Sequence, residues 1–274
     1  MNKNKFTGKV IIAGAGPGDP ELITLKALGY LRKAEVVITD RLVSELILAN
    51  YVNKNALILR VGKQCRKEAS TAQSDINSLL VKHALDGKLV VRLKGGDVSI
   101  FSNILDELES LIANHISYEI IPGITAASGA AAYSGIPLTA RNQSSAVRLL
   151  TYYKKDLLGE NYWKELAATD DTLVFYMSSG GIDTIMSKLI ENHIGNDKYV
   201  AVIEQATTTY QKIRSCNIHA YRKKWKGNRY ISPTLIIVGK VAALHEQFNW
   251  LENNPIEKEY FKPIAKKSYE PVLV

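Results

Sequence analysis

Residues 88–101 read KLVVRLKGGDVSIF, an apolar run that stops at two glycines and an aspartate. The run has the length and the β-branched content of a buried strand. Gly95 and Gly96 carry no Cβ atom, so they permit positive φ and allow a ligand to lie against bare backbone. Asp97 has two interpretations: it accepts hydrogen bonds from a ligand, or it caps the next helix.

A second glycine-rich turn follows the first predicted strand of the chain. Residues 9–13 (KVIIA) are that strand, the turn GAGPGDP comes next, and residues 21–34 have the apolar spacing of an amphipathic helix. Residues 35–39 (EVVIT) form a second strand, which ends in Asp40 and Arg41. This β-α-β order predicts a parallel sheet, and ligands of such sheets bind beyond the carboxyl ends of the strands.

The turn departs from the dinucleotide-binding fingerprint G-x-G-x-x-G. Gly14 and Gly16 match it, but Asp19 stands at the position of the third glycine, which allows close packing of helix on strand. Pro17 and Pro20 stiffen the turn, and Asp19 suits the N-cap of the following helix. A dehydrogenase function is therefore disfavoured.

Strands and helices continue to alternate after the second strand. The pattern predicts strands at 57–61, 88–94, 118–121, 147–151, 172–177, 199–204, 211–216 and 232–238, and helices at 73–85, 102–114, 126–134 and 182–192. The pattern restarts after Arg141, so we predict one α/β domain over residues 1–141 and a second over residues 142–248. Residues 249–274 lose the periodicity and are predicted to be a tail.

Composition limits the class of protein. The chain has 274 residues, 46% of them hydrophobic and 23% charged, as in an ordinary globular protein. No apolar run approaches the roughly 20 residues of a membrane span. The N-terminus lacks the apolar segment and the cleavage site of a signal peptide. We therefore expect a cytoplasmic protein with no membrane partner.

The net charge and the spacing of cysteines and histidines indicate which kinds of ligand the protein binds. The net charge of +8 suits nucleic acid or an acidic small molecule, and the densest basic cluster, residues 222–226, is predicted in a loop or at a strand edge. No nucleic-acid-binding motif accompanies it, so we predict no nucleic-acid partner and favour a polyanionic metabolite. Cys65, Cys216 and the five histidines show no ligand spacing, so we expect free thiols and no metal.

Seven stretches resemble, in order, the tetrapyrrole methylases. They are GAGPGDPELITLKA, DRLVS, VVRLKGGD, PGITAASG, GIPLT, LVFYM and SPTLIIVG. The likeness runs from about Lys9 to about Leu244 and so covers most of the chain. The combination of DRLVS, RLKGGD and GIPLT is most similar to the uroporphyrinogen-III C-methyltransferases.

The resemblance implies a fold and a reaction. The fold would be two α/β domains, the first with a parallel sheet and the second with a mixed sheet, with a ligand cleft between them. The reaction would move methyl groups from S-adenosylmethionine to carbons 2 and 7 of uroporphyrinogen III. The products would be S-adenosylhomocysteine and precorrin-2, the branch point to siroheme and cobalamin. The resemblance also implies a homodimer.

Matching positions carry the expected site residues of the family. The cofactor contacts would be Pro17, Gly95, Gly96, Asp97, Ile100, Thr125, Ala126, Met177 and Ala206. Asp40 would be the proton acceptor and Lys63 the proton donor. The substrate has eight carboxylates, which suits binding by Arg41, Lys63 and Arg141.

Ordinary structural roles remain open for several of these residues. Asp40 has the alternative of capping a helix that starts near Leu42. Met177 has the alternative of filling the core, and Arg141 that of a solvated surface residue.

Three departures from the family pattern fall on the expected substrate side. After RLKGGD the family continues P-F-x-F-G-R-G-G-E-E, whereas residues 98–107 here read VSIFSNILDE, which predicts a continuous helix start. Asn103 replaces the arginine and cannot make a charged fork to a carboxylate. Ala140 replaces the histidine of T-H-R, and Tyr152–Tyr153 replace the last two residues of T-G-H. A second hypothesis is therefore an S-adenosylmethionine-binding relative with an altered tetrapyrrole substrate or with lost catalysis, a regulatory module.

Overall fold

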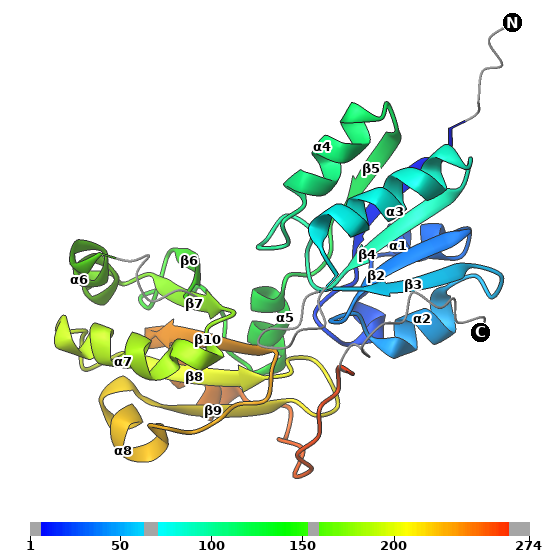
Figure 1. Cartoon of the computed structure of the whole chain (residues 1–274). Helices are drawn as coiled ribbons and strands as arrows, with labels where there is room; N and C mark the ends of the chain where they lie inside the picture. The colour runs from blue at the N-terminus through cyan, green and yellow to red at the C-terminus, as the bar shows by residue number, and fades with distance from the viewer. Residues whose placement is uncertain (1–6, 63–70, 153–158, 263–274) are drawn as a thin grey trace, which may run out of the picture. The chain divides into compact units, whose positions relative to one another are not determined.

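The computed structural model describes residues 7–62, 71–152 and 159–262, and the chain divides into two compact units (Figure 1). The first unit comprises Met1–Thr125 and Phe261–Val274, and the second comprises Ala126–Tyr260. Each unit is built on a five-stranded sheet. The predicted division into domains at Arg141 stays a prediction.

The first sheet is parallel throughout, as the β-α-β pattern predicts. Its strands, in the spatial order β3-β2-β4-β1-β5, are β1 (Lys9–Gly14), β2 (Val36–Asp40), β3 (Leu57–Val61), β4 (Leu89–Lys94) and β5 (Ser117–Ile121). Ala13 pairs with Leu93 on one side and with Ile121 on the other. Because all five strands point the same way, their carboxyl ends lie at one edge of the sheet.

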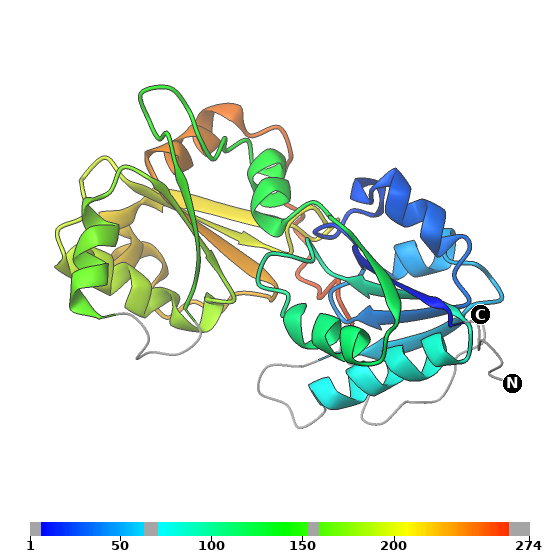
Figure 2. The same ribbon diagram turned by 90° about the horizontal axis from the view of Figure 1, so that it is seen from above.

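Helices cover both faces of the first sheet. One face packs against α1 (Leu25–Leu31) and α2 (Glu45–Tyr51), and the other against α3 (Gln73–Leu85) and α4 (Leu105–Ala113). Helices α3 and α4 lie side by side along their face (Figure 2). Buried aliphatic side chains of the strands alternate between the two faces, so each face has a core of its own.

Two predicted helices of the first unit begin later than their apolar spacing indicates. Asp19 caps only a short 3-10 turn, Pro20–Leu22, and α1 starts at Leu25 with Thr24 as its N-cap. The predicted start of the other helix at residue 102 is also wrong, because Phe101 and Asn103 have φ of 51° and 53°, which an α-helix cannot contain. The segment that precedes α4 is therefore an irregular loop.

The second sheet is mixed. Its strands, in the spatial order β6-β7-β10-β8-β9, are β6 (Val147–Thr151), β7 (Thr172–Tyr176), β8 (Tyr199–Glu204), β9 (Lys212–Asn217) and β10 (Thr234–Gly239). Strands β6 and β7 are parallel, whereas β10 is antiparallel to β7 and to β8, and β8 is antiparallel to β9. The expected combination of a parallel and a mixed sheet is thus confirmed.

Helices also cover the second sheet on both faces. One face packs against α6 (Glu160–Ala168) and α7 (Ile182–Glu191), and the other against α5 (Ala126–Tyr133) and the 3-10 segment Lys240–Leu244. Two short helices, α8 (Tyr221–Trp225) and α9 (His245–Phe248), complete the unit. The basic cluster therefore lies on helix α8, and its predicted placement in a loop or strand edge is wrong.

The described residues include one of the two cysteines and no membrane-spanning helix. Cys216 is a buried free thiol, whereas Cys65 lies outside those residues. Among the helices described, none combines the length and the apolar character needed to cross a membrane.

Candidate functional site

Glycine-rich loops after three strands of the first sheet contact one another. Gly16, after β1, and Gly96, after β4, exchange two backbone hydrogen bonds of 3.1 and 2.7 Å. The Asp97 side chain accepts a hydrogen bond of 2.8 Å from the backbone N of Gly123, which follows β5. The three loops therefore form one surface at the carboxyl edge of the sheet.

Close packing of the loops explains why glycine stands at these positions. A Cβ atom on Gly123 would lie 2.3 Å from the carbonyl oxygen of Gly96, and one on Gly14 would lie 2.6 Å from the same oxygen. A Cβ atom on Gly95 would lie 2.8 Å from the Cβ of Leu42, in the loop after β2. Any side chain would push the loops apart, so the backbones of four loops approach at this edge because glycine is present.

Asp97 is a buried carboxylate at the junction of these loops. Its Oδ1 accepts hydrogen bonds from the backbone N of Ser99 at 2.8 Å and from the Ser99 hydroxyl, while Oδ2 accepts from Gly123. Burial raises the pKa of Asp97, but the hydrogen bonds outweigh burial and hold that pKa below its ordinary value. The alternative that Asp97 caps the next helix is wrong, because α4 begins only at Leu105.

Asp40 lies at the end of β2 and is held by a buried arginine. The Arg92 Nη2 atom donates to Asp40 Oδ1 at 2.5 Å, and the two side chains are 2% and 27% exposed. The Nη1 atom of Arg92 also donates to the Ile38 carbonyl at 3.3 Å. Helix α2 is capped by Ser44, so the alternative that Asp40 caps a helix near Leu42 is wrong. Asp40 therefore presents a partly exposed carboxylate on a fixed, positively charged support.

A buried charge network extends from Asp40 into the first unit. Arg92 Nε and Lys94 Nζ donate to Glu107 Oε1 at 2.9 and 3.0 Å, and Glu107 is fully buried. Burial lowers the pKa of Arg92, but the charges of Asp40 and Glu107 outweigh burial and raise it. Burial and the nearby Arg92 charge lower the pKa of Lys94. Within the described residues, Glu107 Oε2 has no hydrogen-bond partner.

The sequence of β4 contains a signal for this buried charge network. In β4, Val90, Arg92 and Lys94 occupy alternate positions and therefore point to one face of the sheet. All three are buried. Because a buried charge requires a partner, charged residues at alternate positions of an otherwise apolar strand predict an acidic partner on the helix above, here Glu107.

The carboxyl edge of the second sheet brings together residues predicted to contact the cofactor. Strands β7 and β8 point the same way on either side of β10, so Met177 and Ala206 follow them at one edge. The backbone N of Ala127 donates to the Tyr176 hydroxyl at 2.9 Å, which joins the start of α5, where Ala126 lies, to the end of β7. Met177 is 56% exposed, so its alternative role in the core is wrong, while Ala206 is buried.

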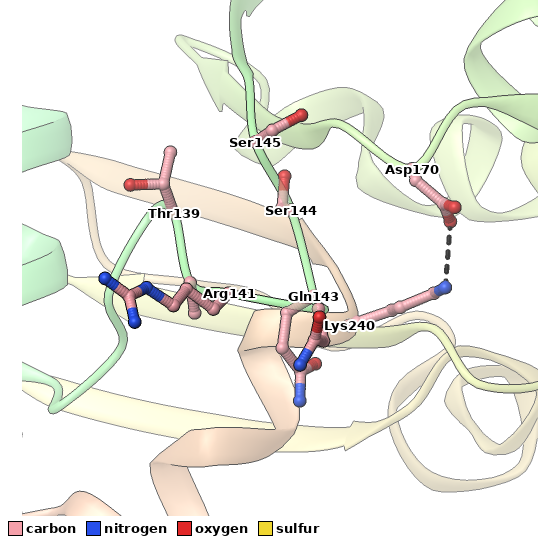
Figure 3. A pocket seen from close by; sticks show the side chains of 9 residues that line it. Thr139, Arg141, Gln143, Ser144, Ser145, Asp170 and Lys240 are labelled. Carbon is pink, nitrogen blue, oxygen red and sulfur yellow. Dashed lines mark ion pairs between the residues drawn. The ribbon is translucent and has the colours of Figure 1, made fainter.

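Arg141 lies beside an open hollow of ≈ 670 Å³ in the second unit (Figure 3). Residues 139–145 line the hollow together with Asp170 and Lys240. The Lys240 Nζ atom lies 3.1 Å from an Asp170 carboxylate oxygen and 3.2 Å from one of Asp197, so this cation is already paired. The exposed Arg141 therefore leaves both of its interpretations open.

The other predicted site residues are placed as follows. Pro17 is buried in the first glycine-rich loop, and Arg41, Ile100 and Thr125 are partly buried. Lys63 lies outside the described residues. Two residues of segment 98–107, which departs from the family pattern, have described side-chain partners of note. Asn103 Nδ2 donates to Asp106 Oδ2 at 2.9 Å, and Glu107 belongs to the buried charge network. No three His, Cys, Asp or Glu side chains in the described part of the chain are grouped to hold a metal.

Comparison with known proteins places these features in a family. The model for the Tetrapyrrole (Corrin/Porphyrin) Methylases matches residues 9–220. Siroheme synthase of Vesicomyosocius okutanii subsp. Calyptogena okutanii (strain HA) is 41% identical over 252 residues, which are 92% of this chain and 54% of that protein. The chain thus spans about half the length of the curated relatives it matches.

Two solved structures have the same fold. Uroporphyrin-III C-methyltransferase from Thermus thermophilus, complexed with S-adenosylhomocysteine, is 30% identical with a TM-score of 0.69, over 85% of this chain and 93% of that one. A cobalt precorrin-4 methyltransferase is 27% identical with a TM-score of 0.76, over 85% of this chain and 95% of that one. From its matching sequence, its two sheets and its glycine-rich carboxyl edge, the chain belongs to the tetrapyrrole methylases.

Proposed function

We propose that the chain transfers methyl groups from S-adenosylmethionine to carbons 2 and 7 of uroporphyrinogen III, giving S-adenosylhomocysteine and precorrin-2 for siroheme and cobalamin synthesis. The observation that carries this proposal is the 2.5 Å contact from Arg92 to Asp40, at the edge where the glycine-rich loops meet. This contact provides a carboxylate of fixed position beside a surface of bare backbone.

The hydrogen-bonding groups at this edge suit S-adenosylmethionine, which carries hydroxyls, an amine and a carboxylate. Asp97 is a carboxylate for hydroxyl or amine donors, and the loop backbones supply N–H and C=O groups. We assign cofactor binding to Pro17, Gly95, Gly96, Asp97, Ile100 and Thr125 of the first unit and to Ala126, Met177 and Ala206 of the second. When bound, the cofactor supplies an electrophilic methyl carbon.

Asp40 is assigned as the proton acceptor. Methylation of a pyrrole carbon requires that a proton leave the alkylated ring system, and a positioned carboxylate speeds that removal by about 10²–10⁴-fold. The hydrogen bond from Arg92 restricts the Asp40 carboxylate to one orientation. Less entropy is therefore lost when the carboxylate is positioned to accept the proton from the tetrapyrrole. Lys63 is assigned as the proton donor, as in the family pattern.

The substrate assignment rests on charge. Uroporphyrinogen III has eight carboxylates, and the chain has a net charge of +8. Arg41 and Arg141 are assigned to substrate carboxylates, because a guanidinium binds a carboxylate with two parallel hydrogen bonds. We also propose that the enzyme acts as a homodimer in the cytoplasm.

Labelled methyl transfer tests this proposal. The full chain would be incubated without oxygen with methyl-labelled S-adenosylmethionine and freshly reduced uroporphyrinogen III. The expected result is two labelled methyl groups per tetrapyrrole. Binding of S-adenosylhomocysteine with no label in uroporphyrinogen III would overturn this substrate assignment, and the same result with cobalt precorrin-4 would favour a regulatory module.

A methyltransferase that acts on another tetrapyrrole is the second candidate. The irregular segment before α4, with Phe101 and Asn103 in left-handed conformations, supports it, because the family's arginine is replaced there. The likeness to a cobalt precorrin-4 methyltransferase supports it as well. Offering cobalt precorrin-4 in the same assay separates the two candidates: label should enter only one of the two tetrapyrroles.

A further inference from the structure

The Gln205 side chain ties the loop after β8 to the tail of the chain. It is buried, its Nε2 donates to the Lys258 carbonyl at 2.9 Å, and its Oε1 accepts from the Tyr260 backbone N at 2.6 Å. The amide thereby bonds to residues i and i+2 of the tail, as a neighbouring strand would. Gln205 directly precedes Ala206, which we assign to the cofactor site.

The loop that contains Ala206 has two non-glycine residues in an energetically unfavourable backbone conformation. Gln205 has φ of 49° and Thr207 has φ of 65°, a left-handed conformation that residues other than glycine seldom adopt. Such residues keep this conformation only where their surroundings enforce it, and they concentrate at functional sites. The Thr207 N donates to Gln211 Oε1 at 2.7 Å, and Gln211 Nε2 donates to the Tyr133 carbonyl of α5 at 3.1 Å. Side-chain amides thus hold both ends of the loop.

The tail is itself anchored to the edge strand β9. Asn253 accepts from the Ile213 backbone N at 2.6 Å and donates to the Ile213 carbonyl at 2.9 Å. Asn254 donates to the Thr209 carbonyl at 2.6 Å. These hydrogen bonds hold Asn253 and Asn254 against the second unit, a few residues before the tail reaches Gln205.

We propose that residues 253–260 act as a clasp that holds residues 205–208 in the shape that binds the adenosine part of S-adenosylmethionine, with Gln205 as the positioning residue. The inference rests on the proposed function, since it takes Ala206 as a cofactor contact. The clasp explains why residues 253–260, which form no helix or strand, make several hydrogen bonds to the second unit: they stabilise a loop that would otherwise relax.

Calorimetric titration of the full chain with S-adenosylhomocysteine tests the clasp. Gln205→Ala is expected to weaken binding about tenfold, since both of its bonds to the tail are lost. With methyl transfer as a second readout, the KM for S-adenosylmethionine should rise by a similar factor. At saturating cofactor, kcat and the KM for the tetrapyrrole should stay within about twofold, which a general loss of structure would not allow.

Two matched variants complete the test. Gln205→Met keeps the length of the side chain and loses both hydrogen bonds to the tail, so its affinity should fall as far as that of Gln205→Ala, and it serves as the readout if Gln205→Ala does not fold. Lys212→Ala removes the ion pair to the exposed Glu257 of the tail and leaves both Gln205 hydrogen bonds in place, so affinity should stay within about twofold.

The outcomes separate the inference from the proposed function. If the unaltered chain binds S-adenosylhomocysteine and folded Gln205 variants bind it equally well, the clasp is overturned and the proposed function stands. If the unaltered chain does not bind S-adenosylhomocysteine, the proposed function is overturned, and the clasp with it.

Discussion

Glu107 shows how strongly one buried side chain constrains the site. It accepts hydrogen bonds from Arg92 and Lys94, is fully buried, and is linked to Asp40 through Arg92. Removing one partner from such a network leaves an uncompensated charge in a medium of low dielectric constant, and this loss costs more than the intact pairs gain. Glu107 is therefore a positioning residue, whereas Asp40 is the proposed catalytic residue.

We predict that Glu107→Gln lowers the free energy of unfolding by about 3 kcal/mol, because Arg92 and Lys94 would remain buried beside each other with one carboxylate fewer. Urea unfolding followed by fluorescence measures the change. Asp106→Asn is the matched control: the side chain of this neighbouring acid accepts a hydrogen bond from Asn103 outside the buried network, and its replacement should change stability by less than about 0.5 kcal/mol. Equal effects of the two substitutions would show that the buried network contributes no special stability.

At the scale of elements, the strands were the most predictable part of the chain. The predictions for β3, α3, β6 and β8 match the observed bounds. The starts of short helices were not, since the helix considered near Leu42 begins only at Glu45, where Ser44 caps it, and α1 starts where Thr24 caps it and not where the apolar spacing begins. Local capping decided these boundaries, whereas periodicity over the whole segment decided the strands.

Glu119 joins three elements of the first unit. It accepts hydrogen bonds from Lys26 and Tyr30 of α1 and from Lys9 of β1, while itself belonging to β5. The bonds from Lys26, then Lys9 and Tyr30, lower the pKa of Glu119 to about 2. A carboxyl whose pKa is lower in the folded protein adds stability above its ordinary pKa, and that stability is lost as the pH falls through the folded value.

We predict that Glu119→Gln makes the free energy of unfolding depend less steeply on pH below about pH 5. At pH 7 the variant should unfold at lower urea concentration than the parent chain. The difference should shrink as the pH falls from about 5 towards 2, because Glu119 becomes protonated first in the unfolded chain and then, as the pH reaches its folded pKa, in the folded chain. Urea midpoints at several pH values give the comparison. A difference that stays constant across this range would contradict the assigned cause.

At the scale of the whole molecule, the family could be predicted from the sequence because seven stretches resemble its motifs in order. In a parallel sheet, the glycine-rich stretches that follow strands are expected to meet at the carboxyl edge. The loops after β1, β4 and β5 meet as that rule implies. The buried charge network was not predicted, because Glu107 lies on a helix and reaches β4 only in the folded chain. The clasp was not predicted for a similar reason: Gln205 and Tyr260 are distant in sequence, and no periodicity marks the tail.

The most direct test of the account is the rate of labelled methyl transfer by Asp40→Asn, measured beside its affinity for S-adenosylhomocysteine. The substitution keeps the shape of the side chain and removes the proton acceptor. We predict that transfer to uroporphyrinogen III slows by about 10²–10⁴-fold, while the affinity stays within about twofold. Transfer at the parent rate would contradict the role of Asp40 as the base, and an equal loss of transfer and affinity would make Asp40 a structural residue.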